Sequence, residues 1–251
     1  MFNVIIKKNS DEVDSKAFKI MKDVVKSNRR PVLGLATGSS PVGLYKKMIA
    51  DHIVNGTSYK RCVTFNLDEY VGLPADHAQS YYTFMHENLF SGIDVLEENI
   101  HIPNGNAKDE ASACREYEDE LKKYEVDIQI LGIGSDGHIA FNEPGTPFES
   151  ETHLMKLTEQ TRKDNARFFG GDIEKVPSEA ITQGLASIMR SKKIVLIATG
   201  KNKADALYNM IHGPKTNACP ASVLQNHQDV TVILDEDAAE KLGKINLLCD
   251  F

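Results

Sequence analysis

The sequence predicts an α/β protein built on one doubly wound, mostly parallel sheet flanked by helices, a Rossmann-like architecture. Short apolar segments alternate with segments of helical periodicity along the 251 residues, and turns rich in Gly, Ser, Thr and Asp follow several of the apolar segments. We find no Ser/Pro/Gly-rich linker, block of like charge, low-complexity tract or repeat. We therefore expect residues 1–251 to form a single domain.

The first half of the chain predicts a βαβ beginning and its continuation. Asn3–Lys7 and Pro31–Ala36 are short apolar segments typical of strands. Between them, Asp11–Ser27 carries apolar residues at helical spacing. The same alternation predicts, in order, a helix, a strand, two helices and a strand: Val42–His52, Cys62–Leu67, Ser80–Leu89, Glu110–Tyr124 and Val126–Leu131.

The second half repeats the pattern. Pro177–Met189 predicts a helix whose start is marked by Pro177 and Ser178. Lys193–Ala198 reads as a buried strand, Asn202–Ile211 as the helix after it and Val230–Leu234 as a last strand. We therefore expect a sheet of about six or seven parallel strands, with ligands bound outside the carboxyl ends of those strands.

Charge and cysteine usage exclude several classes of protein. The net charge of −7 argues against a nucleic-acid partner or an anionic membrane surface, because both need clustered Lys and Arg. No apolar segment is long enough for a signal peptide or a membrane span. The chain has four cysteines, Cys62, Cys114, Cys219 and Cys249. They form no CxxC pair, which argues against structural zinc or a redox centre. We expect a protein of the reducing cytoplasm.

The most informative segment is Leu131–Pro144, called here the Gly-His turn. It places Asp136, His138 and Glu143 directly after a predicted strand. As metal ligands these residues match neither HExxH nor a zinc-ribbon spacing, so no metal is expected. A histidine flanked by two carboxylates is typical of proton transfer, in which the acids orient the imidazole. The alternative is a histidine hydrogen-bonded in a structural loop, which the position at a strand end makes less favoured.

A second turn follows the strand of Pro31–Ala36. This turn consists of Thr37, Gly38, Ser39 and Ser40. Its glycine and hydroxyl groups lie at a predicted helix N-terminus and are suited to binding a phosphate group. Taken alone, the same residues read more simply as a helix cap, with Pro41 at the first helical position. Neither the Walker pattern nor GxGxxG is present, so nucleotide binding is not expected.

A third turn contains Asp68 and Glu69 at the end of the Cys62–Leu67 strand. Because side chains alternate in an extended chain, one of the two acids can enter the crevice while the other turns away. A carboxylate in a partly dry cleft can act as a base near neutral pH. The simpler interpretation is a solvated pair on the surface.

Two cations are candidates for phosphate binding. Lys203 lies at a predicted helix start, where its charge opposes the helix dipole, and Arg167 could grip a phosphate with two hydrogen bonds. Without the turns, either would be read as a solvated surface charge. Two further histidines, His86 and His101, have no comparable setting and are expected to be structural.

Several of these segments together resemble the glucosamine-6-phosphate deaminase family. The resemblance extends over nearly the whole chain and rests on these segments: Thr64–Pro74, Ser80–Tyr82, Gly134–Pro144 and Asn165–Phe169. It implies conversion of D-glucosamine 6-phosphate and water into D-fructose 6-phosphate and ammonia, without a cofactor. It also implies that His138, oriented by Asp136 and Glu143, opens the sugar ring, and that Asp68 moves the C2 proton. The family's phosphate site then corresponds to Thr37–Ser40, Arg167 and Lys203.

Two rival functions and one question of regulation accompany this resemblance. The 6-phosphogluconolactonases share a similar Gly-x-Asp-Gly-His turn, and a non-catalytic sugar-phosphate sensor is the alternative from another class. Family members activated by N-acetylglucosamine 6-phosphate carry basic residues after the Gly-His turn and a longer C-terminus. Here that segment is Ser150–Lys156 and the sequence ends at Phe251, so we expect weak or absent activation. A homo-oligomer is left open.

Overall fold

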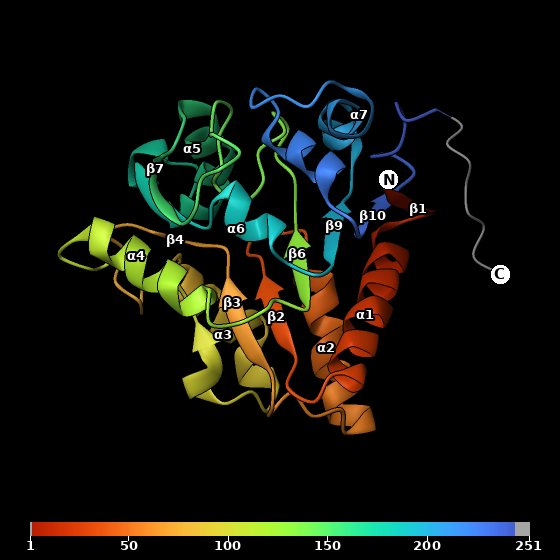
Figure 1. The fold of residues 1–251 in the computed structure, drawn as a ribbon, viewed down its shortest axis with the longest axis vertical. Coiled ribbons are helices and arrows are strands. Elements are labelled where there is room, and N and C mark those ends of the chain that lie inside the picture. The colour runs from red at the N-terminus through yellow and green to blue at the C-terminus, as the bar shows by residue number, and fades with distance from the viewer. Residues whose placement is uncertain (1, 244–251) are drawn as a thin grey trace.

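The computed structural model describes residues 2–243 and contains a seven-stranded, wholly parallel sheet. The strand order is β1-β10-β9-β6-β2-β3-β5 (Figure 1). The strands are β1 (Asn3–Lys7), β2 (Val32–Leu35), β3 (Val63–Asn66), β5 (Ile100–His101), β6 (Ile128–Leu131), β9 (Ile194–Ala198) and β10 (Val230–Asp235). The predicted fold class and strand number are confirmed; β5 is the strand that the sequence analysis missed.

Helices cover both faces of this sheet. They are α1 (Ser10–Ser27), α2 (Val42–Asn55), α3 (Tyr81–Asn88), α4 (Glu110–Leu121), α5 (Glu159–Asn165), α6 (Leu185–Met189) and α7 (Ala204–His212). Side chains of β2 show the two faces, because they alternate along the strand. Leu33 and Leu35 join the apolar cluster that includes residues of α1 and α2. Val32 instead joins Tyr117 and Leu121 of α4.

The order in which strands are added to the sheet reverses between β2 and β6. From β2 the chain proceeds to β3 and β5 on one side, whereas β6, β9 and β10 follow one another on the other side. Such a switch point leaves a crevice at the carboxyl ends of the central strands, since the connections leave in opposite directions. The turns after β2, β3, β6 and β9 therefore meet at one edge, which is where the sequence predicts the site.

A second sheet lies beyond that edge and was not predicted. It consists of β4 (Asp68–Tyr70), β8 (Glu179–Thr182) and β7 (His153–Lys156), paired antiparallel in the order β4-β8-β7. Figure 1 shows β7 and α5 beyond the arrowheads of the central strands. An apolar cluster that includes Tyr70, Phe141 and Phe169 packs this sheet against the short helix η3 (Ala166–Phe169) and the Gly-His turn. The small sheet thus forms one wall of the crevice.

The predicted helix over Pro177–Met189 is wrong in its first half. Residues Glu179–Thr182 form the central strand β8, and only Leu185–Met189 is helical. Pairing with two neighbouring strands outweighs local helical periodicity here. Gly184 lies between the two elements. Only glycine fits at this position, because a Cβ would lie 2.1 Å from the carbonyl oxygen of Ser150.

Helix α5 was not predicted, and apart from β5 the other helices and strands of the large sheet match the predicted ones with shifted ends. Side-chain caps define the starts of three helices, with Asn9, Ser80 and Asp109 accepting hydrogen bonds from first-turn backbone N–H groups.

No helix within residues 2–243 is long and apolar enough to cross a membrane. Cys62, Cys114 and Cys219 are buried free thiols, and Cys249 lies outside the described residues.

Candidate active site

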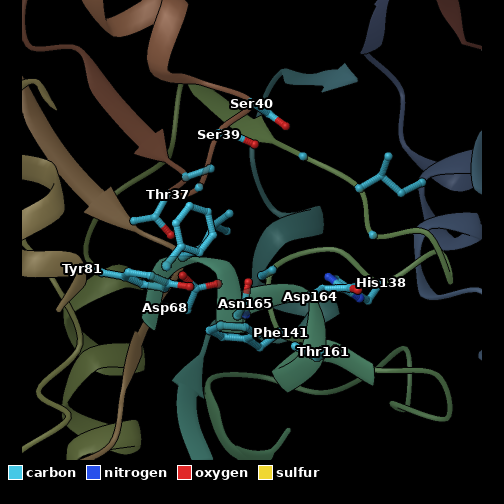
Figure 2. A pocket seen from close by; sticks show the side chains of 18 of the residues that line it. Thr37, Ser39, Ser40, Asp68, Tyr81, His138, Phe141, Thr161, Asp164 and Asn165 are labelled. Carbon is cyan, nitrogen blue, oxygen red and sulfur yellow. The ribbon is translucent and has the colours of Figure 1, made fainter. Parts of the chain in front are cut away.

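A cavity of about 320 Å³ opens at the carboxyl edge of the central strands (Figure 2). Its walls come from the turns after β2, β3, β6 and β9, together with α5 and the short helix η3 (Ala166–Phe169) that follows it. Of the predicted site residues, the cavity lining contains Thr37, Gly38, Ser39, Ser40, Asp68, His138, Arg167 and Lys203. Segments far apart in the sequence are thus brought to one site by the parallel sheet.

The Thr37–Ser40 turn leaves its hydroxyl groups free of helix capping. Helix α2 begins at Val42, its N-cap is Pro41, and no side chain makes a capping hydrogen bond there. The predicted alternative, a side-chain cap, is therefore wrong. Figure 2 shows Ser39 and Ser40 next to each other on one side of the cavity, with Thr37 closer to Asp68. These groups and the helix N-terminus suit an anionic ligand.

Two cations from separate elements line the same cavity. Lys203 ends the short helix η5 (Lys201–Lys203) and precedes α7, and Arg167 lies on η3. Burial lowers the pKa of Lys203, the positive charge of Arg167 lowers it further, and the negative charge of Asp164 opposes this. The Arg167 guanidinium lies 4.7 Å from the centre of the Phe168 ring. Both cations are in place to neutralise an anion.

Asp68 is the first residue of β4 and is only 5% exposed. Burial raises the pKa of its carboxyl, and the neighbouring charge of Glu69 raises it further, to about 8. A carboxylate with a pKa near the working pH is suited to taking and returning a proton. The interpretation as a solvated surface pair is wrong for both acids, since both are buried.

Glu69 turns away from the cavity, as the alternation of side chains in an extended chain requires. It accepts hydrogen bonds from the backbone N–H groups of Tyr70 at 2.8 Å, Tyr81 at 2.9 Å and Tyr82 at 2.9 Å. Burial raises the pKa of Glu69, although these hydrogen bonds oppose the increase. Glu69 therefore fixes β4 to the start of α3.

The Gly-His turn places a histidine against two carboxylates. Nδ1 of His138 lies 2.7 Å from Oδ1 of Asp136 and 4.0 Å from Oε2 of Glu143. Burial alone would raise the pKa of Asp136, but the contact and charge of His138 outweigh it and lower that pKa to about 2. Asp136 is therefore charged throughout the neutral range. A fixed carboxylate at Nδ1 leaves Nε2 as the nitrogen available to a ligand.

Glu143 is 4% exposed, and its Oε1 accepts a hydrogen bond from the backbone N–H of Thr158 at 3.2 Å. Glu143 and Asp136 are absent from the cavity lining, and both lie on the Nδ1 side of His138. Ligand atoms of the three residues lie within 4.8 Å of one another, a spacing that a cation could share. The imidazole nitrogen of that cluster, however, already faces Asp136. The geometry is that of an oriented imidazole.

The aromatic side of the cavity was not predicted from the sequence. Tyr81 and Phe141 line it with nearly parallel rings, 6.0 Å between centres and 10° between planes. Burial raises the pKa of Tyr81 well above its usual value, so its hydroxyl stays protonated. In the view of Figure 2, Phe141 lies between Asp68 and His138. In a sequence, such aromatics cannot be told from core residues.

His86 and His101 lie outside the cavity lining, as expected. The His101 ring stacks on Phe65 with 4.4 Å between ring centres, and Nε2 of His86 lies 3.7 Å from Oε1 of Glu97. Both histidines therefore have structural contacts of their own.

Fold and site together define a class of protein, the α/β enzymes that bind a small anionic substrate at a sheet switch point and move protons there. Residues 7–233 match the family model described as glucosamine-6-phosphate isomerases/6-phosphogluconolactonase, and the chain belongs to this family.

Named relatives agree with this assignment. The chain is 49% identical to a glucosamine-6-phosphate deaminase of Halalkalibacterium halodurans, covering 96% of this chain and 98% of the relative. It is 51% identical to one of a Thermoanaerobacter species, covering 94% and 93%. A solved structure described as a monomeric glucosamine-6-phosphate deaminase superposes with a TM-score of 0.93 at 43% identity, covering 95% of this chain and 99% of that one.

The rival enzyme shares the fold. A 6-phosphogluconolactonase from Trypanosoma cruzi superposes with a TM-score of 0.79 at 22% identity, covering 97% of each chain. At that identity the likeness extends to the fold alone, and the site must distinguish the two activities.

Proposed function

We propose that this protein converts D-glucosamine 6-phosphate and water into D-fructose 6-phosphate and ammonia. The observation that carries the proposal is a buried carboxylate, Asp68, with a pKa of about 8, in a cavity that also contains a carboxylate-oriented histidine. Two separate proton-transfer groups fit a reaction that needs both ring opening and proton transfer between carbons. The relatives at about half identity carry the name of this activity.

The phosphate group would bind at the Thr37–Ser40 turn, between Arg167 and Lys203. The hydroxyl groups that do not cap α2, the N-terminus of that helix and the two cations support this assignment. The reacting carbons are uncharged, so the phosphate group supplies much of the binding energy. That energy is then available to orient the carbons in the site.

His138 would open the pyranose ring by moving a proton between the anomeric hydroxyl and the ring oxygen. Its contact with Asp136 and its proximity to Glu143 fix the orientation of the imidazole, which leaves Nε2 to exchange a proton with the sugar. His138 then returns to its starting state, so that no net proton is consumed in this step.

Asp68 would act on the open-chain sugar. Its carboxylate takes the proton from C2 to give an enolamine and returns a proton to C1, after which water replaces nitrogen at C2 and ammonia leaves. The raised pKa supports both halves of this transfer, because the carboxylate is basic enough to accept the proton and the acid is strong enough to return it. The proton transfers of ring opening and of the C2-to-C1 isomerisation each have a residue to carry them, so the proposed reaction uses neither metal nor organic cofactor.

The proposal extends to the setting of the enzyme. A sugar phosphate would be its small-molecule partner, without nucleic acid or membrane, and we assign it to the cytoplasm. Weak or absent activation by N-acetylglucosamine 6-phosphate and the oligomeric state stay predictions of the same proposal.

The test offers the purified protein two substrates in parallel. We expect fructose 6-phosphate and ammonia from glucosamine 6-phosphate, and no acceleration of 6-phosphogluconolactone hydrolysis. Lactone hydrolysis without ammonia would identify the rival enzyme. Binding of glucosamine 6-phosphate, measured by calorimetry, without either product would identify a sensor.

A further inference from the structure

Thr182, the last residue of β8, and Gln183 directly after it lie between the turn that carries Asp68 and the Gly-His turn without entering the cavity. Thr182 is 0% and Gln183 1% exposed, and neither belongs to the cavity lining. The sequence analysis gave neither residue a role, because this segment was predicted to be helical. Their position in the structure raises the question of what two buried polar residues do directly behind the site.

One set of contacts joins this pair to the turn that carries Asp68. The backbone N–H of Gln183 donates to the carbonyl oxygen of Leu67 at 2.7 Å. The side-chain Nε2 of Gln183 donates to the carbonyl oxygen of Asn66 at 3.1 Å. Thr182 is the antiparallel partner of Asp68 itself. The backbone on both sides of Asp68 is therefore fixed to β8.

A second set joins the same pair to the Gly-His turn. The backbone N–H of Phe141 donates to Oγ1 of Thr182 at 3.2 Å. Nδ2 of Asn142 donates to the carbonyl oxygen of Gln183 at 2.8 Å and to that of Ile139 at 3.0 Å. These bonds hold the backbone between His138 and Glu143, the two groups that must stay close together.

We propose that Thr182 and Gln183 are positioning residues, which hold the turn carrying Asp68 and the turn carrying His138 at a fixed separation. The inference rests on the proposed function, since it assigns the two turns successive steps on one substrate. Polar groups that are buried and paired on both sides transmit position well, because moving either turn breaks hydrogen bonds that water cannot replace.

The expected signature is a loss of turnover without a loss of binding. A displacement of about 1 Å in a reacting group can reduce the rate about a hundredfold. The proposed phosphate-binding residues lie on other turns, and none of them is a hydrogen-bond partner of Thr182 or Gln183, whose partners include Leu67, Asn66, Phe141, Asn142 and Tyr117. Substrate affinity should therefore stay close to that of the wild type.

The variants are Thr182→Val and Gln183→Met, which keep side-chain volume and remove the side-chain hydrogen bonds to Phe141 and Asn66. The backbone hydrogen bonds of Gln183 to Leu67 and Asn142 remain in both variants. Their matched controls are Thr231→Val on β10 and Gln129→Met on β6, which are equally buried and contact neither turn through their side chains. For all four we would measure kcat, KM, inorganic phosphate affinity and thermal stability, and the hydrogen exchange rate of the Phe141 amide. The amide rate reports the contact without depending on catalysis.

We expect kcat to fall about tenfold to a hundredfold in Thr182→Val and Gln183→Met, with KM and phosphate affinity within about twofold of the wild type. Exchange at Phe141 should accelerate in Thr182→Val but not in Thr231→Val. Equal kcat in the variants and their controls would overturn the proposal, as would unchanged exchange at Phe141. If the wild type forms no product, the proposed function fails instead, and the exchange rates still decide whether Thr182 holds the turn.

Discussion

At the scale of single residues, Asp68 and Glu69 show how one position decides a role. The two acids are adjacent in β4, yet Asp68 enters the cavity and Glu69 binds three backbone N–H groups outside it. The sequence analysis predicted that one acid would turn inward, from alternation alone. It could not predict that both would be buried, because that depends on β8 and α3 covering them.

Replacing Asp68 by Asn should abolish turnover and leave binding nearly intact. The amide cannot accept the C2 proton, so we expect kcat to fall about a thousandfold to ten-thousandfold, the upper part of the range that a general base contributes. Phosphate affinity should change little, since Asp68 does not touch the proposed phosphate site. Steady-state kinetics and calorimetry with inorganic phosphate check this, and retained turnover would assign the base to another residue.

The same substitution should stabilise the fold at alkaline pH. The folded pKa of Asp68 is about 8 and its ordinary value is 3.8, so the folded state holds the proton more tightly. The wild type therefore loses unfolding free energy as pH rises from 4 to 8. Asp68→Asn should lack this loss and gain on the order of a few kcal/mol at the upper end. Urea unfolding at several pH values tests this, and a gain independent of pH would contradict it.

The pH dependence of kcat/KM should report the titration of the Asp68 carboxyl. Because the base must be deprotonated, kcat/KM should rise with pH and level off above about 8. The charge of Glu69 contributes to the raised pKa, so Glu69→Gln should move the rising limb to lower pH. An unmoved limb would mean that burial alone sets the pKa of Asp68.

The tyrosines around Asp68, namely Tyr45, Tyr70, Tyr81 and Tyr117, stay neutral because burial raises their pKa values.

At the scale of elements, the site is built from turns at strand ends, which sequence patterns locate well. Glycines and hydroxyl groups after β2 and the Gly-His turn after β6 were both predictable, because apolar segments end abruptly before them. The strands that were missed, β4, β5, β7 and β8, are short and pair with distant segments, and the missed helix α5 has only seven residues. Their structure depends on tertiary contacts, so local periodicity carries little signal for them.

Gly134 should be needed for the position of His138. A Cβ at Gly134 would lie 2.3 Å from the His138 ring and 2.7 Å from Oδ1 of Asp136. Gly134→Ala must therefore separate the imidazole from its carboxylate, and we expect kcat to fall about a hundredfold. His138→Gln should cost a similar amount, and the double variant should lose little more. Full additivity of the two losses would show that Gly134 acts elsewhere.

The two cations should act on binding more than on chemistry. Arg167→Ala and Lys203→Ala each remove one charge-assisted contact with phosphate, so KM should rise about tenfold or more and kcat should change less. The natural control is Lys201→Ala, also on η5 but absent from the cavity lining. An unchanged KM in Arg167→Ala would remove Arg167 from the site.

At the scale of the whole molecule, the parallel sheet brings distant segments to one edge. The switch between β2 and β6 places the turns after β2, β3, β6 and β9 around one cavity, and the small antiparallel sheet forms a wall of it. The alternation of segments was enough to predict the large sheet and its active edge. The small sheet and the buried link through Thr182 and Gln183 were not predictable, since neither follows from periodicity.

The central claim is that Asp68 and His138 convert glucosamine 6-phosphate to fructose 6-phosphate and ammonia without a cofactor. The most direct measurement incubates the metal-stripped protein with glucosamine 6-phosphate and quantifies both products together. We expect equal amounts of fructose 6-phosphate and ammonia from the wild type, and neither from Asp68→Asn. Formation of neither product by the wild type, or equal formation by Asp68→Asn, would contradict the account.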